Sequence, residues 1–360
     1  MRLLIDIGHP GHVHLFRPMA EELLQKGHQV LFTCRQKEFE IELLEAAGLD
    51  YISFGKHFQT KTGKLYGLAK FNLKMLQTAL RFKPDLLLSH GSLYAAQIAW
   101  ILRKPHISME DSGNWEQMRL YLPFTKHVLT PNELKEDLGP KQIRYLGYHE
   151  LAYLHPDIFT PDENIWKLLG LKKGAPFALL RFVSWSATHD VGQGGLTMET
   201  KLELIRTLDS RMKVFISAEG QLPDKLKEYQ IRIAPEKMHD VLAKATLFIG
   251  EGATMASEAG VLGTPAIYVN SLERCYNEDQ EKYGTVFNFR TSEGVVDKVN
   301  ELIADQSLKQ KTQQGRIRML NEKINVTAFL VWFMEQYPES AATMMSNPDY
   351  QSNFRKPYHG

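Results

Sequence analysis

Along most of the chain, short apolar runs alternate with longer segments in which apolar residues recur every three to four positions. The short runs predict buried strands, and the longer segments predict amphipathic helices. In the first part of the chain, strands are expected at residues 3–7, 29–33, 50–53, 85–89, 106–109 and 127–129. Helices are expected between them, for example at residues 18–26, 38–47, 70–81 and 93–103. This alternation predicts a parallel sheet with right-handed crossover connections.

A second series of the same kind begins after a polar, proline-containing segment at residues 145–161. Its expected strands are residues 177–182, 213–217, 232–234, 247–249, 266–269 and 285–287. Since 360 residues exceed the usual size of a single core, we predict two doubly wound α/β domains, at residues 1–147 and 148–325. Ligands of such sheets bind beyond the carboxyl ends of the strands, so the site is expected in a cleft between the domains.

The end of the chain has a different pattern. Residues 326–337 are strongly apolar, with Phe329, Leu330, Trp332 and Phe333 among them, and predict a helix that packs back on the core. Residues 338–360 are polar and contain several Ser, Asn and Pro, which is typical of a loosely ordered tail.

Composition and charge exclude several classes of protein. Hydrophobic residues make up 43% of the chain and charged residues 24%, as in ordinary globular proteins, and a net charge of +1 gives no general attraction to nucleic acid. The two cysteines, Cys34 and Cys275, lie far apart in the sequence, which fits a reducing cytosol and no cysteine-based zinc site. No run of about 18 apolar residues predicts a membrane span. We therefore expect a cytoplasmic protein.

The stretch from residue 245 to residue 270 combines a strand, a glycine turn, a short helix and a second strand. Gly252, Ala253 and Thr254 lie at the turn, where backbone N–H groups and the positive end of a helix dipole can face a bound anion. Glycine also lets a phosphate approach the backbone closely. The turn therefore predicts a phosphate-bearing ligand such as a nucleotide. Glu258 follows in the helix, where it either stabilises the dipole or accepts hydrogen bonds from ribose hydroxyls.

Residues 8–18 directly follow the first predicted strand and include His9, Gly11, His12 and His14, with Pro18 expected as the first residue of a helix. Imidazole titrates near neutral pH, so His12 and, after it, His9 are candidates for a general base. The pair of histidines His12 and His14 also has a spacing that suits a metal ion. No carboxylate or cysteine ligand is adjacent to them, so no metal site is expected.

Polar residues also follow other predicted strands. Arg181 precedes a glycine-containing loop and suits a diphosphate, because a guanidinium can make paired hydrogen bonds to two oxygens. Ser217 and Glu219, at the end of the next strand, are candidates for further polar contacts with the ligand. Asp111 follows a strand of the first domain beside Glu110 and is a possible acid–base group, although such residues are also common in simple turns.

Seven basic residues and no acidic residue lie between Lys56 and Lys83, with Tyr66, Phe71, Leu73 and other apolar residues interleaved. The plainest interpretation is a solvated helix face. The alternatives are docking on an anionic membrane surface or on a phosphate-bearing acceptor, since each basic residue near such a surface contributes roughly 1 kcal/mol. Nucleic acid would use similar charge, but no nucleic-acid motif accompanies it.

Two of these motifs together resemble the GT-B-fold glycosyltransferases. The sequence Gly11-His12-Val13 before a helix is similar to their amino-terminal loop, and residues 252–258 followed by Gly263 and Pro265 are similar to their nucleotide-sugar motif. The nearest familiar pattern is that of the N-acetylglucosaminyltransferase that completes lipid II. The layout, over nearly the whole chain, also resembles the non-hydrolysing UDP-N-acetylglucosamine 2-epimerases. The nearest match overall is the prokaryotic family known as domain of unknown function 354.

The resemblance implies a GT-B-like pair of Rossmann-like domains and a UDP-sugar donor, with no metal or other cofactor. It implies that His12 lies near the acceptor and the donor diphosphate. It further implies that Gly252, Ala253 and Thr254 hold the diphosphate, and that the Ser257–Glu258 pair supplies the ribose-binding glutamate. The match is incomplete, because His9 and Pro10 occupy part of a glycine-richer loop. The 2-epimerases also have His-Gly-Asp-Thr where this chain has Ser92 in place of the carboxylate, which argues against epimerase chemistry.

The leading hypothesis is a glycosyltransferase that moves a sugar from UDP to a hydroxyl of a lipid-linked or cell-envelope polysaccharide acceptor. His12 would act as the base or would position the acceptor, with His9 and Asp111 as lesser candidates. The expected location is the cytoplasm, with possible peripheral contact at the inner face of the plasma membrane. The alternatives are a UDP-sugar 2-epimerase or hydrolase on the same fold, a non-catalytic nucleotide-sugar-binding protein, and a nucleic-acid binder that uses the basic span.

Overall fold

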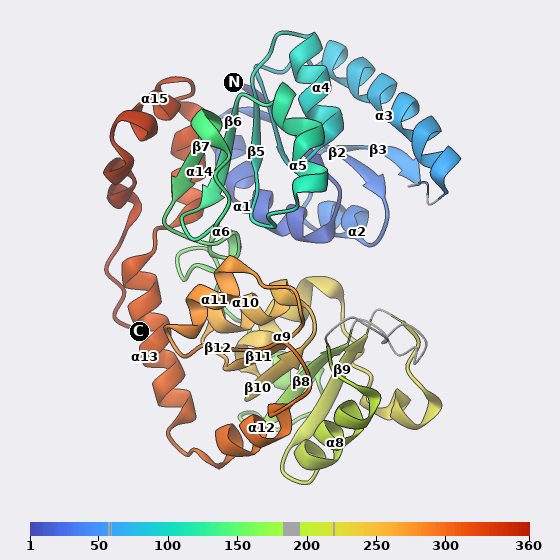
Figure 1. The fold of residues 1–360 in the computed structure, drawn as a ribbon, viewed down its shortest axis with the longest axis vertical. Helices are drawn as coiled ribbons and strands as arrows, with labels where there is room; N and C mark the ends of the chain where they lie inside the picture. Colours follow the sequence, from blue (N-terminus) through green and yellow to red (C-terminus); the bar gives the residue numbers. More distant parts are fainter. Residues whose placement is uncertain (57, 59, 183–194, 219) are drawn as a thin grey trace. The chain divides into compact units, whose positions relative to one another are not determined.

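The computed structural model describes residues 1–56, 58, 60–182, 195–218 and 220–360. The described chain divides into two compact units (Figure 1). The first unit comprises Met1–Tyr153 and Ile324–Arg355, and the second comprises Leu154–Lys323 and Lys356–Gly360. The divisions fall six and two residues from the boundaries expected at 147 and 325.

The first unit is built on a seven-stranded parallel sheet with the order β3-β2-β1-β4-β5-β6-β7. Its strands are β1 (Arg2–Ile7), β2 (Gln29–Gln36), β3 (Tyr51–Lys56), β4 (Leu86–His90), β5 (His106–Met109), β6 (His127–Pro131) and β7 (Gln142–Tyr145). Leu3, Leu4 and Ile5 of β1 are fully buried, as expected for a strand that is covered on both faces of its sheet. The strand order reverses between β1 and β4, which is where ligands of doubly wound sheets bind.

Helices cover both faces of this sheet, and two of them come from the end of the chain. They are α1 (Pro10–Gln25), α2 (Glu40–Ala46), α3 (Lys61–Phe82), α4 (Leu93–Ile101), α5 (Trp115–Tyr121), α14 (Val326–Glu335) and α15 (Glu339–Ser346). The short helix α6 (Leu151–Leu154) lies at the division between the units. The side chain of Glu335 on α14 accepts hydrogen bonds from Lys26 (2.8 Å) and pairs with His28 (2.9 Å), so α14 is tied to the end of α1.

The second unit contains a five-stranded parallel sheet with the order β12-β11-β10-β8-β9. Its strands are β8 (Phe177–Phe182), β9 (Lys213–Ala218), β10 (Leu247–Gly250), β11 (Ala266–Val269) and β12 (Val286–Phe289). Its helices are α7 (Ile165–Leu168), α8 (Met198–Asp209), α9 (Met238–Lys244), α10 (Ala253–Leu262), α11 (Cys275–Glu281), α12 (Val295–Ala304) and α13 (Leu308–Glu322). Here the strand order reverses between β8 and β10.

Four local expectations from the sequence are wrong. The first helix begins at Pro10, so Pro18 lies inside it and not at its start. Residues 232–234 form no strand, and the single bridge nearby joins Ile216 to Gln230. The edge strand β7 was not expected at all. Residues 338–360, expected as a loose tail, include α15 and a 3-10 helix (Pro348–Phe354) whose Gln351 accepts a hydrogen bond from the Leu146 N–H at 2.7 Å.

We predict that Gly315→Ala destabilises the second unit. A Cβ at Gly315 in α13 would lie 2.0 Å from the backbone oxygen of Tyr283, so the helix would have to move away. The overpacking should cost about 1–3 kcal/mol, more than the gain of up to about 1 kcal/mol in helix propensity. Urea unfolding measures the change, and Gln314→Ala at an exposed position of the same helix is the control. A Gly315→Ala protein as stable as the wild type would contradict the close approach.

Candidate functional site

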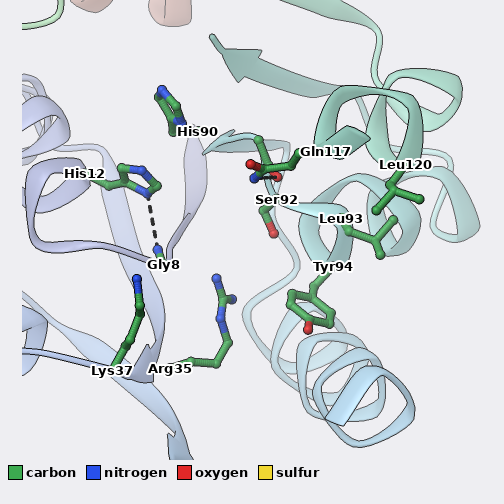
Figure 2. Close-up of a pocket in the computed structure, with 11 residues that line it drawn as sticks. Gly8, His12, Arg35, Lys37, His90, Ser92, Leu93, Tyr94, Gln117 and Leu120 are labelled. Atoms are coloured by element: carbon green, nitrogen blue, oxygen red, sulfur yellow. Dashed lines mark hydrogen bonds between the residues drawn. The ribbon is translucent and has the colours of Figure 1, made fainter. Parts of the chain in front are cut away.

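A pocket lies in the first unit where the strand order reverses (Figure 2). Gly8 follows β1 and His90 ends β4, so the two strands on either side of the reversal both contribute to its wall. The pocket has a volume of about 290 Å³. It is lined by Gly8, His12, Arg35, Lys37, His90, Gly91, Ser92, Leu93, Tyr94, Gln117 and Leu120.

Two of the expected histidines begin helix α1. His9 is its N-cap, and its ring Nδ1 accepts a hydrogen bond from the N–H of Gly11 at 3.0 Å. His12 lies in the first turn, where its Nδ1 accepts from the N–H of Gly8 at 3.3 Å (Figure 2). Because this bond uses the Nδ1 lone pair, neutral His12 carries its proton on Nε2. His12 lines the pocket, whereas the side chain of His9 is half exposed beside Glu38.

Asp111, a candidate acid–base group, lies between two histidines. Its carboxylate lies between two imidazoles, 3.1 Å from Nε2 of His90 and 2.9 Å from Nδ1 of His149. The ring of His90 in turn stacks on the ring of His12, with 4.5 Å between the centroids. His12, His90, Asp111 and His149 therefore form one connected group beside the pocket.

The surroundings shift the pKa values of His12 and His90, two neighbouring histidines, in opposite directions. Burial, helped by the charges of His90 and His9, holds the pKa of His12 well below its ordinary value. Burial alone would also lower the pKa of His90, but the hydrogen bond and charge of Asp111 outweigh it and raise the pKa. Burial opposes ionisation of Asp111, yet His149 and His90 hold the pKa of that carboxyl well below its ordinary value. The surroundings therefore favour the neutral form of His12 and the charged form of His90.

The same three side chains are also a candidate metal site. One potential ligand atom from each of His90, Asp111 and His149 lies within 4.8 Å of the other two. The carboxylate of Asp111 already contacts both imidazoles, so the close approach of the three side chains is explained without an ion. The sequence expectation of no metal stays a prediction.

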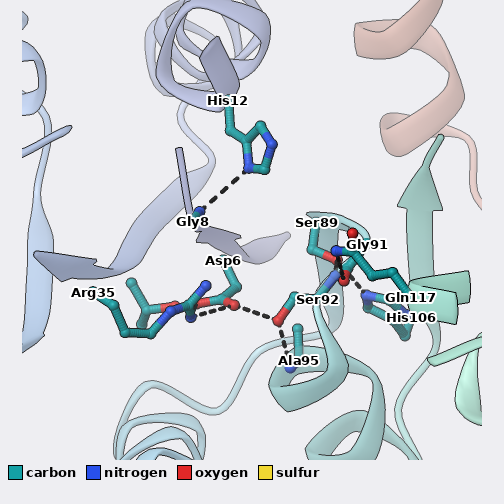
Figure 3. A network of polar contacts seen from close by, with 11 residues as sticks. Asp6, Gly8, His12, Arg35, Ser89, Gly91, Ser92, Ala95, His106 and Gln117 are labelled. Carbon is teal, nitrogen blue, oxygen red and sulfur yellow. Dashed lines mark hydrogen bonds and ion pairs between the residues drawn. The ribbon is translucent and has the colours of Figure 1, made fainter. Parts of the chain in front are cut away.

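Arg35, which lines the pocket, belongs to a buried ion pair with Asp6 (Figure 3). Asp6, at the end of β1, accepts from Nη1 of Arg35 through both of its oxygens at 2.6 Å and from the hydroxyl of Thr33 at 2.6 Å. The hydroxyl of Ser92, the N-cap of α4, also donates to Asp6. The carboxylate is thus fully engaged. No motif in the sequence pointed to Asp6 or Arg35.

The candidate nucleotide site of the second unit lies at its own reversal of strand order, between β8 and β10. Gly252 is the N-cap of α10 and has no side chain to occupy the free N–H groups of the first turn, which Ala253 and Thr254 begin. Arg181 of β8 pairs with Gly250 of β10, and its Nη1 donates to the hydroxyl of Ser217 at 2.8 Å. The structure therefore brings Arg181, Ser217 and the Gly252 turn to one edge of the sheet.

Glu258 lies on α10, 5% exposed, and one of its oxygens is 3.0 Å from Nε2 of His239 on α9. Ser257, the neighbour of Glu258, is fully buried. Its hydroxyl accepts a hydrogen bond from the side-chain amide of Gln280 at 2.5 Å. Ser257 is therefore a packing residue of α10 and α11. Glu219, and residues 183–194 that follow Arg181, lie outside the described residues.

A second pair of charges fixes the turn before α10. The ammonium of Lys201, which is 2% exposed, lies 3.1 Å from the carboxylate of Glu251. The same oxygen of Glu251 accepts from the N–H of Leu196 at 3.0 Å. Glu251 thus ties the turn to the start of α8, and the backbone N–H groups of the next residues are held in place before any ligand binds.

We predict that Asp111→Asn lowers the pKa of His90 from above its ordinary value to below it. The substitution removes the charge and weakens the hydrogen bond that favour the imidazolium, so burial becomes the dominant effect. An NMR titration of the histidine rings measures this pKa. Glu116→Gln, an exposed substitution on α5, is the control and should leave the titration of His90 unchanged. An unchanged pKa in Asp111→Asn would show that His90 does not depend on this carboxylate.

Comparison with known proteins places the chain in a family and in a fold. The family model described as "Protein of unknown function (DUF354)" matches residues 1–328. An uncharacterized protein of Methanocaldococcus jannaschii is 25% identical over 275 residues, which make up 73% of this chain and 80% of the relative.

Among solved structures, a UDP-GlcNAc 2-epimerase of Neisseria meningitidis bound to UDP-GlcNAc has a TM-score of 0.68 at 15% identity, covering 93% of this chain and all of the other. A spinosyn rhamnosyltransferase has a TM-score of 0.58 at 14% identity, over 93% of this chain and all of its own. These likenesses confirm the expected GT-B-like fold of two parallel-sheet α/β domains. The match over residues 1–328 shows that the chain belongs to the DUF354 family.

Proposed function

We propose that the protein is a glycosyltransferase that uses a UDP-sugar donor. The observation that carries this proposal is the uncapped N-terminus of α10, which lies beside Arg181 at the reversal of strand order in the second unit. Free N–H groups, the helix dipole and a guanidinium together favour a diphosphate. Support also comes from the similar fold of a 2-epimerase that was solved with UDP-GlcNAc bound.

Each donor-side residue has a role that follows from its position. The N–H groups at Gly252, Ala253 and Thr254 and the guanidinium of Arg181 would hold the diphosphate and stabilise the charge that develops as UDP leaves. The carboxylate of Glu258, oriented by His239, would accept hydrogen bonds from the ribose hydroxyls. No metal ion is needed in this scheme, because backbone and guanidinium donors supply the positive charge.

The histidines of the first unit would orient the acceptor. The Nδ1 of His12 already accepts from Gly8, so its Nε2–H is the group that can bind an acceptor oxygen. This favours the positioning role for His12 over the role of general base. Asp111 would act through His90, because its carboxylate is shared by two imidazoles. His9, half exposed at the N-cap, is a lesser candidate for contact with the acceptor.

The position of Ser92 favours transfer over epimerisation. Where the 2-epimerases resemble this segment they have an aspartate, but here a hydroxyl donates to the buried Asp6. The pocket therefore presents no carboxylate from this position to a sugar carbon. A hydrolase on the same fold remains the rival to be separated by experiment, together with a binding protein without turnover.

We predict that Glu258→Gln weakens UDP binding about tenfold, since a charged acceptor of ribose hydrogen bonds is replaced by a neutral one. Isothermal titration calorimetry with UDP measures the loss, and Glu301→Gln, an exposed substitution on α12, is the control. Equal UDP affinity in Glu258→Gln and the wild type, or no UDP binding at all, would remove the donor assignment.

Turnover of radiolabelled UDP-N-acetylglucosamine with cell-envelope lipid extract tests the reaction class. The proposal predicts that label moves to the extract and that little UDP forms without it. Release of a 2-epimer by the protein alone would show an epimerase, and rapid UDP release without extract would show a hydrolase. Binding without any turnover of UDP-sugars would show a binding protein.

We also propose that helix α3 docks the first unit on an anionic membrane. Tyr66, Leu73 and Leu80, spaced seven residues apart, form an exposed stripe, and each is more than half exposed. At helical spacing Lys70, Lys74 and Arg81 fall together on one flank of this stripe. An apolar stripe with a basic flank suits the interface of anionic lipids. Among the described residues, no helix is long and apolar enough to cross a membrane.

Sedimentation with liposomes that contain anionic lipid measures this docking. Replacing Lys70 and Arg81 by Gln should weaken binding roughly 30-fold, at about 1 kcal/mol for each basic residue. The matched control replaces Lys225 and Lys309, two exposed lysines of the second unit, by Gln. Equal, weak binding to neutral and anionic liposomes would contradict the proposal.

A further inference from the structure

Two cationic side chains and two imidazoles line the pocket of the first unit. Arg35, Lys37, His12 and His90 all contribute to the wall, and none of the described lining residues is acidic. We propose that this pocket binds a phosphate group that the acceptor carries. The proposal rests on the proposed function, in which the second unit holds the donor.

Arg35 is the strongest part of the argument. It is 8% exposed, and its Nη1 is fully used by both oxygens of Asp6. Its Nη2 lies on the side of Gly8, since a Cβ on that glycine would come within 2.9 Å of it. The guanidinium plane also packs over the ring of Tyr94, 5.0 Å from the centroid. The ion pair (Figure 3) and the ring fix the guanidinium of Arg35, which lines the pocket (Figure 2).

The other polar groups of the wall come from different elements. Lys37, at the end of β2, is half exposed and lies 3.3 Å from Glu38 at the rim. His90 comes from β4 and His12 from α1, where the Nε2–H of His12 can donate into the pocket (Figure 2). The carboxylates that pair with Arg35 and His90, Asp6 and Asp111, do not line the pocket. The positive end of the dipole of α4 adds to this field.

The direction and chemistry of these groups favour phosphate over the alternatives. Donors from three elements surround the space, which suits the several oxygens of a tetrahedral phosphate better than one planar carboxylate. The side-chain N–H of Gln117 donates to the Gly91 oxygen, which leaves its carbonyl oxygen as an acceptor. The described wall nevertheless carries two cations, Arg35 and Lys37, and no carboxylate, which favours an anion over a neutral sugar. Leu93 and Leu120 complete the wall with apolar surface. A phosphate ester of an apolar chain fits both parts of the pocket.

Calorimetric titration with decyl phosphate, in the presence of saturating UDP, tests the proposal. Saturating UDP blocks the donor site, so any binding must occur elsewhere. We expect one equivalent of decyl phosphate to bind, more tightly than inorganic phosphate and more tightly than decanoate. Lys37→Met should weaken it roughly fivefold, and Arg35→Lys, which keeps the charge beside Asp6 but loses the second nitrogen, about tenfold. Lys104→Met, at an exposed lysine after α4, is the control.

Each outcome decides the question. No binding of decyl phosphate, binding that UDP displaces, or equal affinity for decanoate would overturn the phosphate pocket. Equal affinity for inorganic phosphate would show that the apolar chain is not recognised and that the source is a free phosphate. If UDP fails to bind but decyl phosphate still binds through Arg35 and Lys37, the donor proposal fails while the phosphate pocket stands. Loss of binding in Glu258→Gln would assign the phosphate to the donor site and overturn the proposal.

Discussion

Parallel pairing of the strands is the constraint on which both candidate sites depend. In the described parts of both sheets all neighbouring strands run in the same direction, so their carboxyl ends lie along one edge. Where the strand order reverses, the chain leaves the two central strands in opposite directions, and a space opens between the connections. In the first unit this point lies between β1 and β4, beside Gly8 and His90. In the second it lies between β8 and β10, beside Arg181 and Gly252.

The two candidate sites lie at equivalent points of their sheets but offer different groups to a ligand. In the second unit a helix N-terminus without a capping side chain leaves backbone N–H groups free, and the buried pair of Lys201 and Glu251 holds the turn that precedes them. In the first unit the N–H groups of Gly8 and Gly11 are occupied by the rings of His12 and His9. The positive charge there comes from side chains, above all from Arg35, whose partner Asp6 does not line the pocket. A backbone site suits a nucleotide diphosphate, and a side-chain site allows a different anion.

The elements that the sequence predicted well are those with a purely local signal. Strands such as β5 and β8 are continuous apolar runs, and α10 is bounded by Gly252 and Gly263. Strand β7 was missed because only alternate residues, Ile143 and Tyr145, are buried at the edge of the sheet. The start of α1 was misplaced because Pro10 and Pro18 both suit a first helical turn, and the capping bond of His9, which selects Pro10, is visible only in the structure.

The candidate site was predictable only in part, for a similar reason. The candidates His12, Arg181 and Glu258 could be named from the sequence, because each lies in or near a segment that follows a predicted strand. Arg35 and His149 could not, because each is defined by a partner that is 29 or 38 residues away in sequence, Asp6 and Asp111. Asp111 was named as a candidate, but no local pattern indicated its position between two imidazoles.

The central claim is that a UDP-sugar binds where α10 begins in the second unit. A crystal structure of the protein with UDP tests it most directly. The claim predicts diphosphate oxygens about 3 Å from the backbone nitrogens at Gly252–Thr254 and ribose hydroxyls at the carboxylate of Glu258. UDP bound away from α10, for instance on Arg35 and His90 in the first unit, would contradict it.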